Sequence, residues 1–302
     1  MPSASKRKQK RSSRVLSLLL VVLIALAAYL YSQYLAPPSP PPEPVDGQLL
    51  VHVIDVGQGD AILLTSADGN VLIDAGDNIT RYEQALSAYL DKVGVKELDY
   101  FILTHVHADH IGGADMILSS YPVKNVVMTD AVSTSKAFDA MLSALEASEA
   151  NVIEAKAGLT LTLGDLHMRV LGPVKDYSTT NDQSIVLRAT YGATAMMFSG
   201  DAEGNSQGKS ERDIVAAYSA AELKSDLYKA GHHGSDTSSS EAFLKAVSPK
   251  IVAISVGEGN TYGHPVQSVL DAFRDIGATV YRTDLSGSLV FVSDGESITY
   301  RP

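Results

Sequence analysis

The sequence predicts an α/β protein of four layers, in which two β-rich halves face each other and helices cover their outer sides. Two observations predict this class. From residue 48 onward, short apolar runs bounded by turn-forming residues alternate with segments of helical periodicity. A second group of short apolar runs fills residues 151–199 before the alternation resumes. No internal repeat is visible, so we expect residues 48–302 to form one domain.

The first 47 residues differ in composition from the rest. Residues 1–14 carry six Lys or Arg side chains and residues 15–35 carry no charge. Twenty-one helical residues at about 1.5 Å each just cross a hydrocarbon core of about 30 Å. We therefore expect an uncleaved transmembrane signal-anchor at 15–35, with the basic segment 1–14 in the cytoplasm and the domain outside the cell. Secretion after cleavage of a signal peptide is the alternative.

A proline-rich segment joins the two parts. Residues 37–44 contain six prolines, which fix φ and lack a backbone donor. Residues 36–47 are accordingly predicted to be a stiff polyproline II linker that holds the domain away from the membrane.

The elements of the domain are predicted from the two periodicities of apolar residues. Strand-like runs of apolar residues are expected at 49–56, 61–65, 71–74, 99–103, 126–128, 227–230 and 251–256, with several short strands in 151–171, a hairpin from 184–190 and 193–199, and a β-rich tail after 276. Amphipathic helices are expected at 79–93, 134–150, 239–247 and 266–276, with a further helix after Asp201.

Composition limits the chemistry. The 302 residues are 45% hydrophobic and 20% charged, as in globular proteins. There is no cysteine, which excludes disulfides and thiolate ligands, so any metal must be held by His, Asp or Glu. Residues 47–302 contain 18 basic and 33 acidic side chains, a net charge of −15. This balance argues against tight binding along a phosphate backbone, which relies on Lys and Arg.

A dense group of metal-ligand residues follows the strand at 99–103. Three of the eight histidines, with one aspartate, lie between His105 and His110. Neutral imidazole and carboxylate suit zinc and similar divalent ions. The spacing suits a loop at a strand end, in which His105 and His107 face one ion while Asp109 and His110 face a second.

Two further segments offer ligands. Asp201 follows the apolar run 195–198 and a Ser-Gly pair, and its spacing is equally compatible with a metal ligand and with a helix N-cap. His232 and His233 lie between glycines that allow close backbone approach. His52 and His167 lie in strand-like runs without ligand spacing, and we expect structural roles for them. Neither a serine triad nor a Walker-type phosphate loop is found.

The segment His105–His110 resembles the His-x-His-x-Asp-His signature of the metallo-β-lactamase superfamily. More of the chain is similar to the hydrolase domain that accompanies ComEC, the bacterial DNA-uptake channel. The similarity extends from about residue 48 to the end and rests on the order and spacing of short motifs: Asp55–Asp60, Leu72–Gly76, His105–His110, Asn181–Ser184, Ser199–Asp201, His232–Ser235 and Tyr262–Pro265.

The resemblance implies a role for each candidate. It implies a four-layer αββα fold and two divalent ions, zinc or alternatively manganese, bridged by Asp201. His233 is expected beside Asp109 and His110, although assignment within the histidine pair stays open. Asp109 would also orient the attacking hydroxide, and His232 or His264 would assist the leaving group.

One departure from the superfamily pattern concerns the first ion. Many members carry a further metal-binding histidine before the bridging aspartate, but residues 179–184 contain none. We expect Asp182 or Asn181 to complete the site of His105 and His107, with turn formation as their alternative role. Asp60 is expected to orient a ligand histidine or to form a turn.

The resemblance also implies phosphodiester hydrolysis, with DNA as the leading substrate. The sequence contains no multi-helix channel, so the chain itself would not be the pore. A similar domain in phosphorylcholine esterases makes teichoic-acid phosphodiesters an alternative substrate, and a non-catalytic surface binding module is a second class of function. Hydrolysis of β-lactams is disfavoured by the missing histidine. The implied partners are the phosphodiester substrate and the membrane, and no protein partner is implied.

Overall fold

The computed structural model describes residues 20–27, 29, 45–205 and 208–302. The chain divides into two compact units, residues 1–41 and 42–302. In the first unit, residues 20–27 and 29 are helical. No helix within the described part of the chain is both long enough and apolar enough to cross a membrane. The remainder of the predicted anchor at 15–35, the basic segment 1–14 and most of the linker at 36–47 lie outside the described residues.

The second unit is built on two β-sheets. In the first sheet the strand order is β15-β14-β1-β2-β3-β4-β5-β6. Its strands run antiparallel from β15 to β3 and parallel from β3 to β6. The bounds are β1 Leu49–Val53, β2 Ile62–Ser66, β3 Gly69–Ile73, β4 Leu98–Ile102, β5 Val123–Met128, β6 Asn151–Glu154, β14 Leu289–Ser293 and β15 Ile298–Arg301.

The second sheet has the strand order β13-β12-β11-β10-β9-β8-β7. Strands β7 to β10 pair antiparallel, and β10 to β13 pair parallel. The bounds are β7 Thr160–Leu163, β8 Leu166–Gly172, β9 Val186–Tyr191, β10 Thr194–Phe198, β11 Leu227–Lys229, β12 Ile251–Ile254 and β13 Thr279–Arg282.

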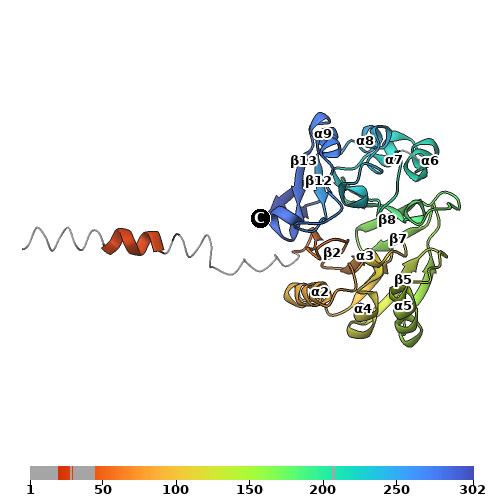
Figure 1. Cartoon of the computed structure of the whole chain (residues 1–302), viewed down its shortest axis with the longest axis horizontal. Coiled ribbons are helices and arrows are strands. Elements are labelled where there is room, and N and C mark those ends of the chain that lie inside the picture. The colour runs from red at the N-terminus through yellow and green to blue at the C-terminus, as the bar shows by residue number, and fades with distance from the viewer. Residues whose placement is uncertain (1–19, 28, 30–44, 206–207) are drawn as a thin grey trace, which may run out of the picture. The chain divides into compact units, whose positions relative to one another are not determined.

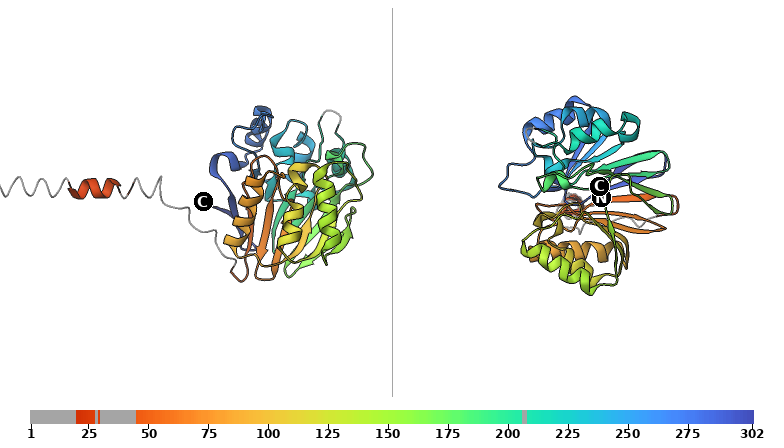
Figure 2. Two further views of the ribbon diagram at one scale, coloured as in Figure 1. Left: turned by 60° about the horizontal axis from the view of Figure 1, so that its bottom comes forward. Right: turned by 90° about the vertical axis from the view of Figure 1, so that its right-hand side faces the viewer.

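Helices cover the outer face of each sheet, as Figure 1 and the right-hand view of Figure 2 show. The helices over the first sheet are α2 Thr80–Val93, α3 Ala108–Ile111, α4 Ala114–Ser120 and α5 Lys136–Ala147. Those over the second sheet are α6 Ser210–Ala217, α7 Ala220–Leu223, α8 Glu241–Val247 and α9 Gln267–Asp275, and a short helix, α10 Thr283–Ser286, joins β13 to β14.

Alternation along the strands divides the core into layers. In β10, Met196 and Phe198 pack between the two sheets, whereas Met197 faces the helices of its own sheet. In β2, Ile62 and Leu64 likewise face the opposite sheet, and Leu63 faces α2 and its neighbours. Both faces of each sheet are therefore buried, which explains why the central strands are apolar runs rather than strict alternations.

The predicted two-sheet α/β class is confirmed, and so is the hairpin of β9 and β10. Two local predictions need correction, and one helix was not predicted. Strand β1 ends at Val53 rather than at 56, because the chain leaves the sheet for the turn at Gly57. The helix α3 begins inside the histidine-rich motif, at Ala108, where the sequence predicted a loop. The helix α4 was not predicted, because Ala114–Ser120 is too short for a clear periodicity.

Candidate metal centre

The predicted ligands gather where parallel strands of both sheets end. The loop after β4 and helix α3 carry His105 to His110, and the loops after β10 and β11 carry Asp201 and His233. Strand β3 is parallel to β4, and β10 is parallel to β11, so each pair presents its carboxyl ends on one edge. Ligands of α/β proteins bind beyond such ends.

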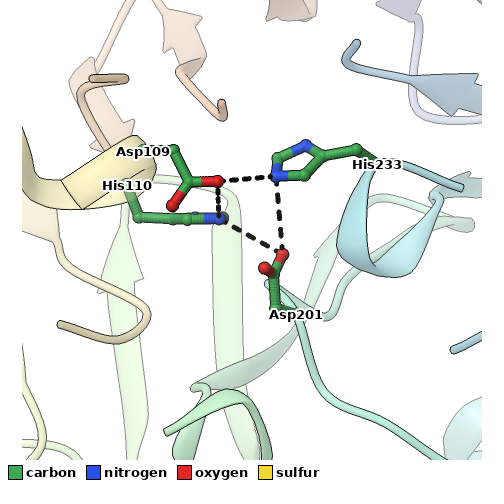
Figure 3. A group of neighbouring side chains, drawn as sticks. All are labelled: Asp109, His110, Asp201 and His233. Carbon is green, nitrogen blue, oxygen red and sulfur yellow. Dashed lines mark hydrogen bonds and ion pairs between the residues drawn. The ribbon is translucent and has the colours of Figure 1, made fainter. Parts of the chain in front are cut away.

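One group contains Asp109, His110, Asp201 and His233, whose ligand atoms all lie within 4.8 Å of one another. Figure 3 shows the four side chains converging from both halves of the domain. His110 Nε2 lies 3.2 Å from Asp201 Oδ1, and His233 Nε2 lies 3.3 Å from Asp109 Oδ2. Two imidazoles and two carboxylates in this arrangement could hold a divalent ion.

A second group shares the same aspartate. His105, His107 and Asp201 have ligand atoms within 4.8 Å of one another. His105 Nε2 lies 3.7 Å from Asp201 Oδ2 and 3.1 Å from His107 Nδ1. Asp201 therefore turns one oxygen to each group, which is the placement that a bridging carboxylate requires.

The donor atoms fit a cation. His110 Nε2 and Asp201 Oδ1 are buried side-chain atoms without a hydrogen-bond partner in the described structure. Such groups are rare in proteins, because a buried polar atom without a partner is costly. A divalent ion bound at these atoms would satisfy both of them.

Hydrogen bonds at Nδ1 aim the histidines at this space. His110 Nδ1 donates to Asp74 Oδ2 at 2.7 Å, and His233 Nδ1 donates to the Ser255 carbonyl oxygen at 3.0 Å. These partners assign the proton to Nδ1 and leave Nε2 free as a ligand. His105 Nδ1 lies 3.2 Å from Thr104 Oγ1, and that hydroxyl donates to Asp74 at 2.6 Å. Asp74 thus orients His110 directly and His105 through Thr104.

Asp60 lies behind His233. Its Oδ1 is 3.3 Å from His233 Nδ1, and its Oδ2 forms an ion pair with Lys229 Nζ. Both side chains of the ion pair are 1% exposed. The predicted proximity of Asp60 to a ligand histidine is found, although the Ser255 carbonyl oxygen is the closer partner of Nδ1. Burial raises the pKa of Asp60, but Lys229 and the histidines outweigh it and lower that pKa to about 2.

A close backbone contact brings the Asp60 loop against α3. The Asp60 amide donates to the Asp109 carbonyl oxygen at 3.1 Å. At Gly59, φ is +143°, and a Cβ atom would lie 2.4 Å from that same carbonyl oxygen. Only glycine fits this approach, because the obstructing atom belongs to the backbone.

The electrostatics of the centre favour a cation. Burial disfavours the charged form of His110, but the carboxylates of Asp201, Asp74 and Asp109 outweigh it and hold the pKa of His110 well above its ordinary value. Burial would raise the pKa of Asp201, yet the surrounding histidines hold it well below its usual range. A group of carboxylates that stabilises a proton on imidazole also stabilises a metal ion in its place.

His232 and His264 line the outer side of the centre. His232 Nε2 lies 3.6 Å from Asp201 Oδ2, and its ring is 24% exposed. Its Nδ1 is 3.1 Å from Thr237 Oγ1 and 3.5 Å from Glu203 Oε1. The rings of His232 and His264 meet edge to face, with centroids 5.6 Å apart. Both histidines therefore stand where a substrate held at Asp201 would lie.

Asp182 does not join either group, and its predicted ligand role needs correction. Its carboxylate accepts hydrogen bonds from the amides of Lys209 and Ser210 at 3.1–3.3 Å and from the Glu203 amide at 3.3 Å. It thus holds the start of α6. Asn181 Nδ2 donates to Glu203 Oε1 at 3.0 Å, so its amide faces Glu203 rather than the histidines.

The two histidines expected to be structural lie in strands. His52 is fully buried in β1, and its Nδ1 is 2.9 Å from the Tyr89 hydroxyl. Burial lowers the pKa of His52 to about 3, so the ring is neutral. His167 lies on β8, where its Nδ1 is 3.4 Å from Thr162 Oγ1.

Sequence reasoning gave no role to Asp74 or Lys229. Asp74 directly follows β3, and an acidic residue at the end of an apolar strand was an available signal. Lys229 is a single charge inside the apolar run 227–230, which suggests a buried partner. Which acid it meets could not be read from the sequence, because Asp60 lies in the other sheet's loops.

The comparisons with known proteins agree with this geometry. Residues 54–258 match the family described as the Metallo-beta-lactamase superfamily, and the chain belongs to that superfamily. Its members are typically metal-dependent hydrolases, in keeping with the two His and Asp groups.

Three curated relatives are similar to most of this chain. The chain is 32% identical to ComE operon protein 3 of Bacillus subtilis, over 80% of this chain and 32% of that protein. It is 31% identical to competence protein ComA of Neisseria gonorrhoeae, over 83% of this chain and 33% of that protein. It is 28% identical to recombination protein 2 of Haemophilus influenzae, over 79% of this chain and 28% of that protein. The chain spans about a third of the length of these relatives.

Solved structures share the fold. The metallo-beta-lactamase fold protein YhfI from Bacillus subtilis superposes with a TM-score of 0.55 at 15% identity, covering 82% of this chain and all of that protein. CmlA, a diiron beta-hydroxylase from Streptomyces venezuelae, superposes with a TM-score of 0.53 at 14% identity, covering 80% of this chain and 53% of CmlA. At this identity the likeness concerns the fold alone.

Proposed function

We propose that residues 48–302 form a phosphodiesterase that binds two divalent ions and cleaves DNA. The observation that carries the proposal is the position of Asp201, whose oxygens lie 3.2 Å from His110 Nε2 and 3.7 Å from His105 Nε2. Two ions bound there would neutralise charge on a phosphoryl group and lower the pKa of a coordinated water. Zinc suits this ligand set, and manganese would be tolerated.

The residues of the chain supply the rest of the chemistry. Asp109, with a side chain 32% exposed, lies on the substrate side of the centre and would hold its ion and orient the attacking water. His232 or His264 would donate a proton to the leaving oxygen. Glu203 Oε1 lies 3.5 Å from His232 Nδ1, and this contact orients the His232 ring for this step.

The substrate class rests on the curated relatives. One of them is named as a competence protein and another as a recombination protein, and the similarity covers most of this chain. We propose that the enzyme acts on DNA outside the cell. In this proposal residues 15–35 anchor it in the cell membrane, residues 1–14 stay in the cytoplasm and residues 36–47 space the domain from the bilayer.

The test measures metal content and hydrolysis in the purified protein. Substrates are single- and double-stranded DNA, RNA, bis-nitrophenyl phosphate and choline phosphodiesters. We expect DNA cleavage with zinc or manganese, and Asp109→Ala should lower kcat/KM by roughly 100-fold or more, because a ligand matters at least as much as the outer partners of ligands do. Its partial exposure means that the fold should persist, as circular dichroism would show.

Two outcomes would contradict this proposal. Cleavage of choline or small esters alone would replace DNA with another phosphodiester. A protein that binds no metal and cleaves no phosphodiester would be a surface binding module instead.

A further inference from the structure

One exposed aromatic ring stands beside the centre without an assigned role. Tyr262 is 70% exposed, and among residues 45–205 and 208–302 it is the only Phe or Tyr side chain that is exposed. The other large rings of this part of the chain are buried or half-buried. A large ring kept in water next to a candidate active site suggests contact with a ligand.

The loop that carries Tyr262 is held in one conformation. Asn260 Nδ2 donates to the carbonyl oxygens of Gly257 and His264, at 3.1 and 2.7 Å. Its Oδ1 accepts from the amides of Tyr262 and His264, both at 3.2 Å. A single side chain thus closes the loop through four hydrogen bonds. The backbone that carries Tyr262 therefore has little conformational entropy left to lose on binding, which favours affinity.

A continuous series of rings leads from the centre to Tyr262. His232 Nε2 is 3.6 Å from Asp201, His232 meets His264 edge to face at 5.6 Å, and His264 stacks on Tyr262 at 5.9 Å with planes 27° apart. These separations are within the range of favourable aromatic pairs. His264 covers one side of the Tyr262 ring, while the high exposure of Tyr262 leaves room for a second planar group.

We propose that Tyr262 is a stacking subsite for the nucleobase next to the phosphodiester that is cleaved. The inference rests on the proposed function and deepens it. The net charge of −15 for residues 47–302 disfavours binding along a phosphate backbone, so affinity for a strand needs another source. Stacking on an aromatic ring supplies this affinity. Stacking does not depend on the identity of the base, because every base has a π face.

A nucleobase fits better than a quaternary ammonium group. Recognition of such cations uses a cage of aromatic rings around the charge. At this loop one exposed ring is present among the described residues. The neighbouring ring of His264 lies nearly parallel to Tyr262, with planes 27° apart, and so does not form the side of a cage. The geometry therefore suits a planar ligand.

The test uses the full chain with its metal and three substitutions at one position. Tyr262→Ala removes the ring, Tyr262→Leu keeps apolar bulk, and Tyr262→Phe keeps the ring. On single-stranded DNA we expect KM to rise roughly 5- to 150-fold for the alanine and leucine variants, with kcat within about twofold of wild type and Phe near wild type. An oligonucleotide with abasic sites flanking the cleaved bond should give wild type and Tyr262→Ala the same KM.

A second readout follows the base directly. A 2-aminopurine beside the cleaved bond should lose fluorescence on binding to wild type and Tyr262→Phe, but not to Tyr262→Ala. DNA cleavage by the wild type with an unchanged KM in Tyr262→Ala would overturn the stacking subsite alone. No cleavage of DNA by the wild type would overturn the proposed function, and the subsite with it. A KM for choline esters that depends on Tyr262 while that for DNA does not would assign the ring to a cation.

Discussion

Lys229 and Asp60 form a fully buried ion pair directly behind a ligand histidine. Lys229 ends β11, and Asp60 reaches it from the loop before β2, so the pair joins the two sheets. The other carboxylate oxygen of Asp60, Oδ1, lies 3.3 Å from His233 Nδ1. A buried pair adds little net stability, but losing one partner leaves an uncompensated charge in the interior.

Replacement of Lys229 by Met should therefore lower the free energy of unfolding by about 3–5 kcal/mol. Urea denaturation with a chelator present measures this without a contribution from metal. The matched control is Lys229→Met with Asp60→Asn, which removes both charges and should regain most of the loss. Equal stability of Lys229→Met and wild type would show that the pair is not a buried charge pair in solution.

At this scale the sequence predicted more of the ligands than of their partners. His105 to His110 are adjacent in sequence, so local spacing was enough to mark them. Asp182 was assigned to the centre wrongly. An aspartate in a turn looks the same in sequence whether its carboxylate binds a metal ion or the amides of a helix N-terminus. Its carboxylate meets the amides of α6, and helix N-termini attract such groups. Long-range partners such as Asp74 and Thr104 depend on how β3 lies beside β4.

At the scale of elements, α6 organises the loop that follows His233. Glu211 lies in the first turn of α6 and is fully buried. Its two oxygens accept from the amides of Ser239 at 2.7 Å and Ser240 at 2.8 Å. Residues 238–240 lead from the histidine pair into α8, so one side chain links two helices and the loop between β11 and α8.

Glu211 should make stability depend on pH. Burial outweighs its hydrogen bonds and raises the pKa of Glu211 from 4.5 to about 7. The folded protein therefore binds more protons than the unfolded chain between these values, and stability falls as pH rises from about 4.5 to about 7, by up to about 3 kcal/mol. Unfolding free energies at pH 5 and pH 8 measure the fall.

The control for this prediction is Glu211→Gln, which cannot titrate. Other groups change protonation in the same window, so the quantity to compare is the pH-dependent change in wild type minus that in the variant. We expect the variant to be less sensitive to pH. Identical pH dependence in both proteins would contradict a titrating Glu211.

Most elements were predictable from the sequence, whereas their exact ends were not. Periodicity found α2 and the β9–β10 hairpin, because each buries one clear face. It extended β1 to 56, since Ile54 and Val56 are apolar and buried even though they lie outside the strand. The pattern of apolar residues indicates which residues are buried, whereas backbone hydrogen bonding to a neighbouring strand determines where a strand ends.

At the scale of the whole molecule, the centre joins both sheets. Asp109 and His110 follow strands of the first sheet, and Asp201 and His233 follow strands of the second. A metal ion held by all four would bind the folded state and have no comparable site in the unfolded chain. Metal occupancy and global stability are therefore linked.

Removal of metal should lower the melting temperature. At a free metal concentration of 100 times Kd, binding contributes about 2.7 kcal/mol, which corresponds to roughly 5–10 °C for a domain of this size. Thermal melts with and without chelator, followed by added zinc or manganese, measure the shift. Asp201→Asn is the control and should melt at nearly the same temperature in both conditions. An equal melting temperature for chelated and metal-loaded wild type would contradict a site shared between the sheets.

The order β15-β14-β1 at one side of the first sheet has a separate consequence. Leu49 at the start of β1 pairs with Ser293 of β14, and β15 runs next to β14 as far as Arg301. The first and last strands of this domain, β1 and β15, thus lie on either side of β14 in one sheet. A domain with that property can be spliced into a loop of a host protein, or have its ends rejoined and a new opening made elsewhere, with little disturbance to either partner.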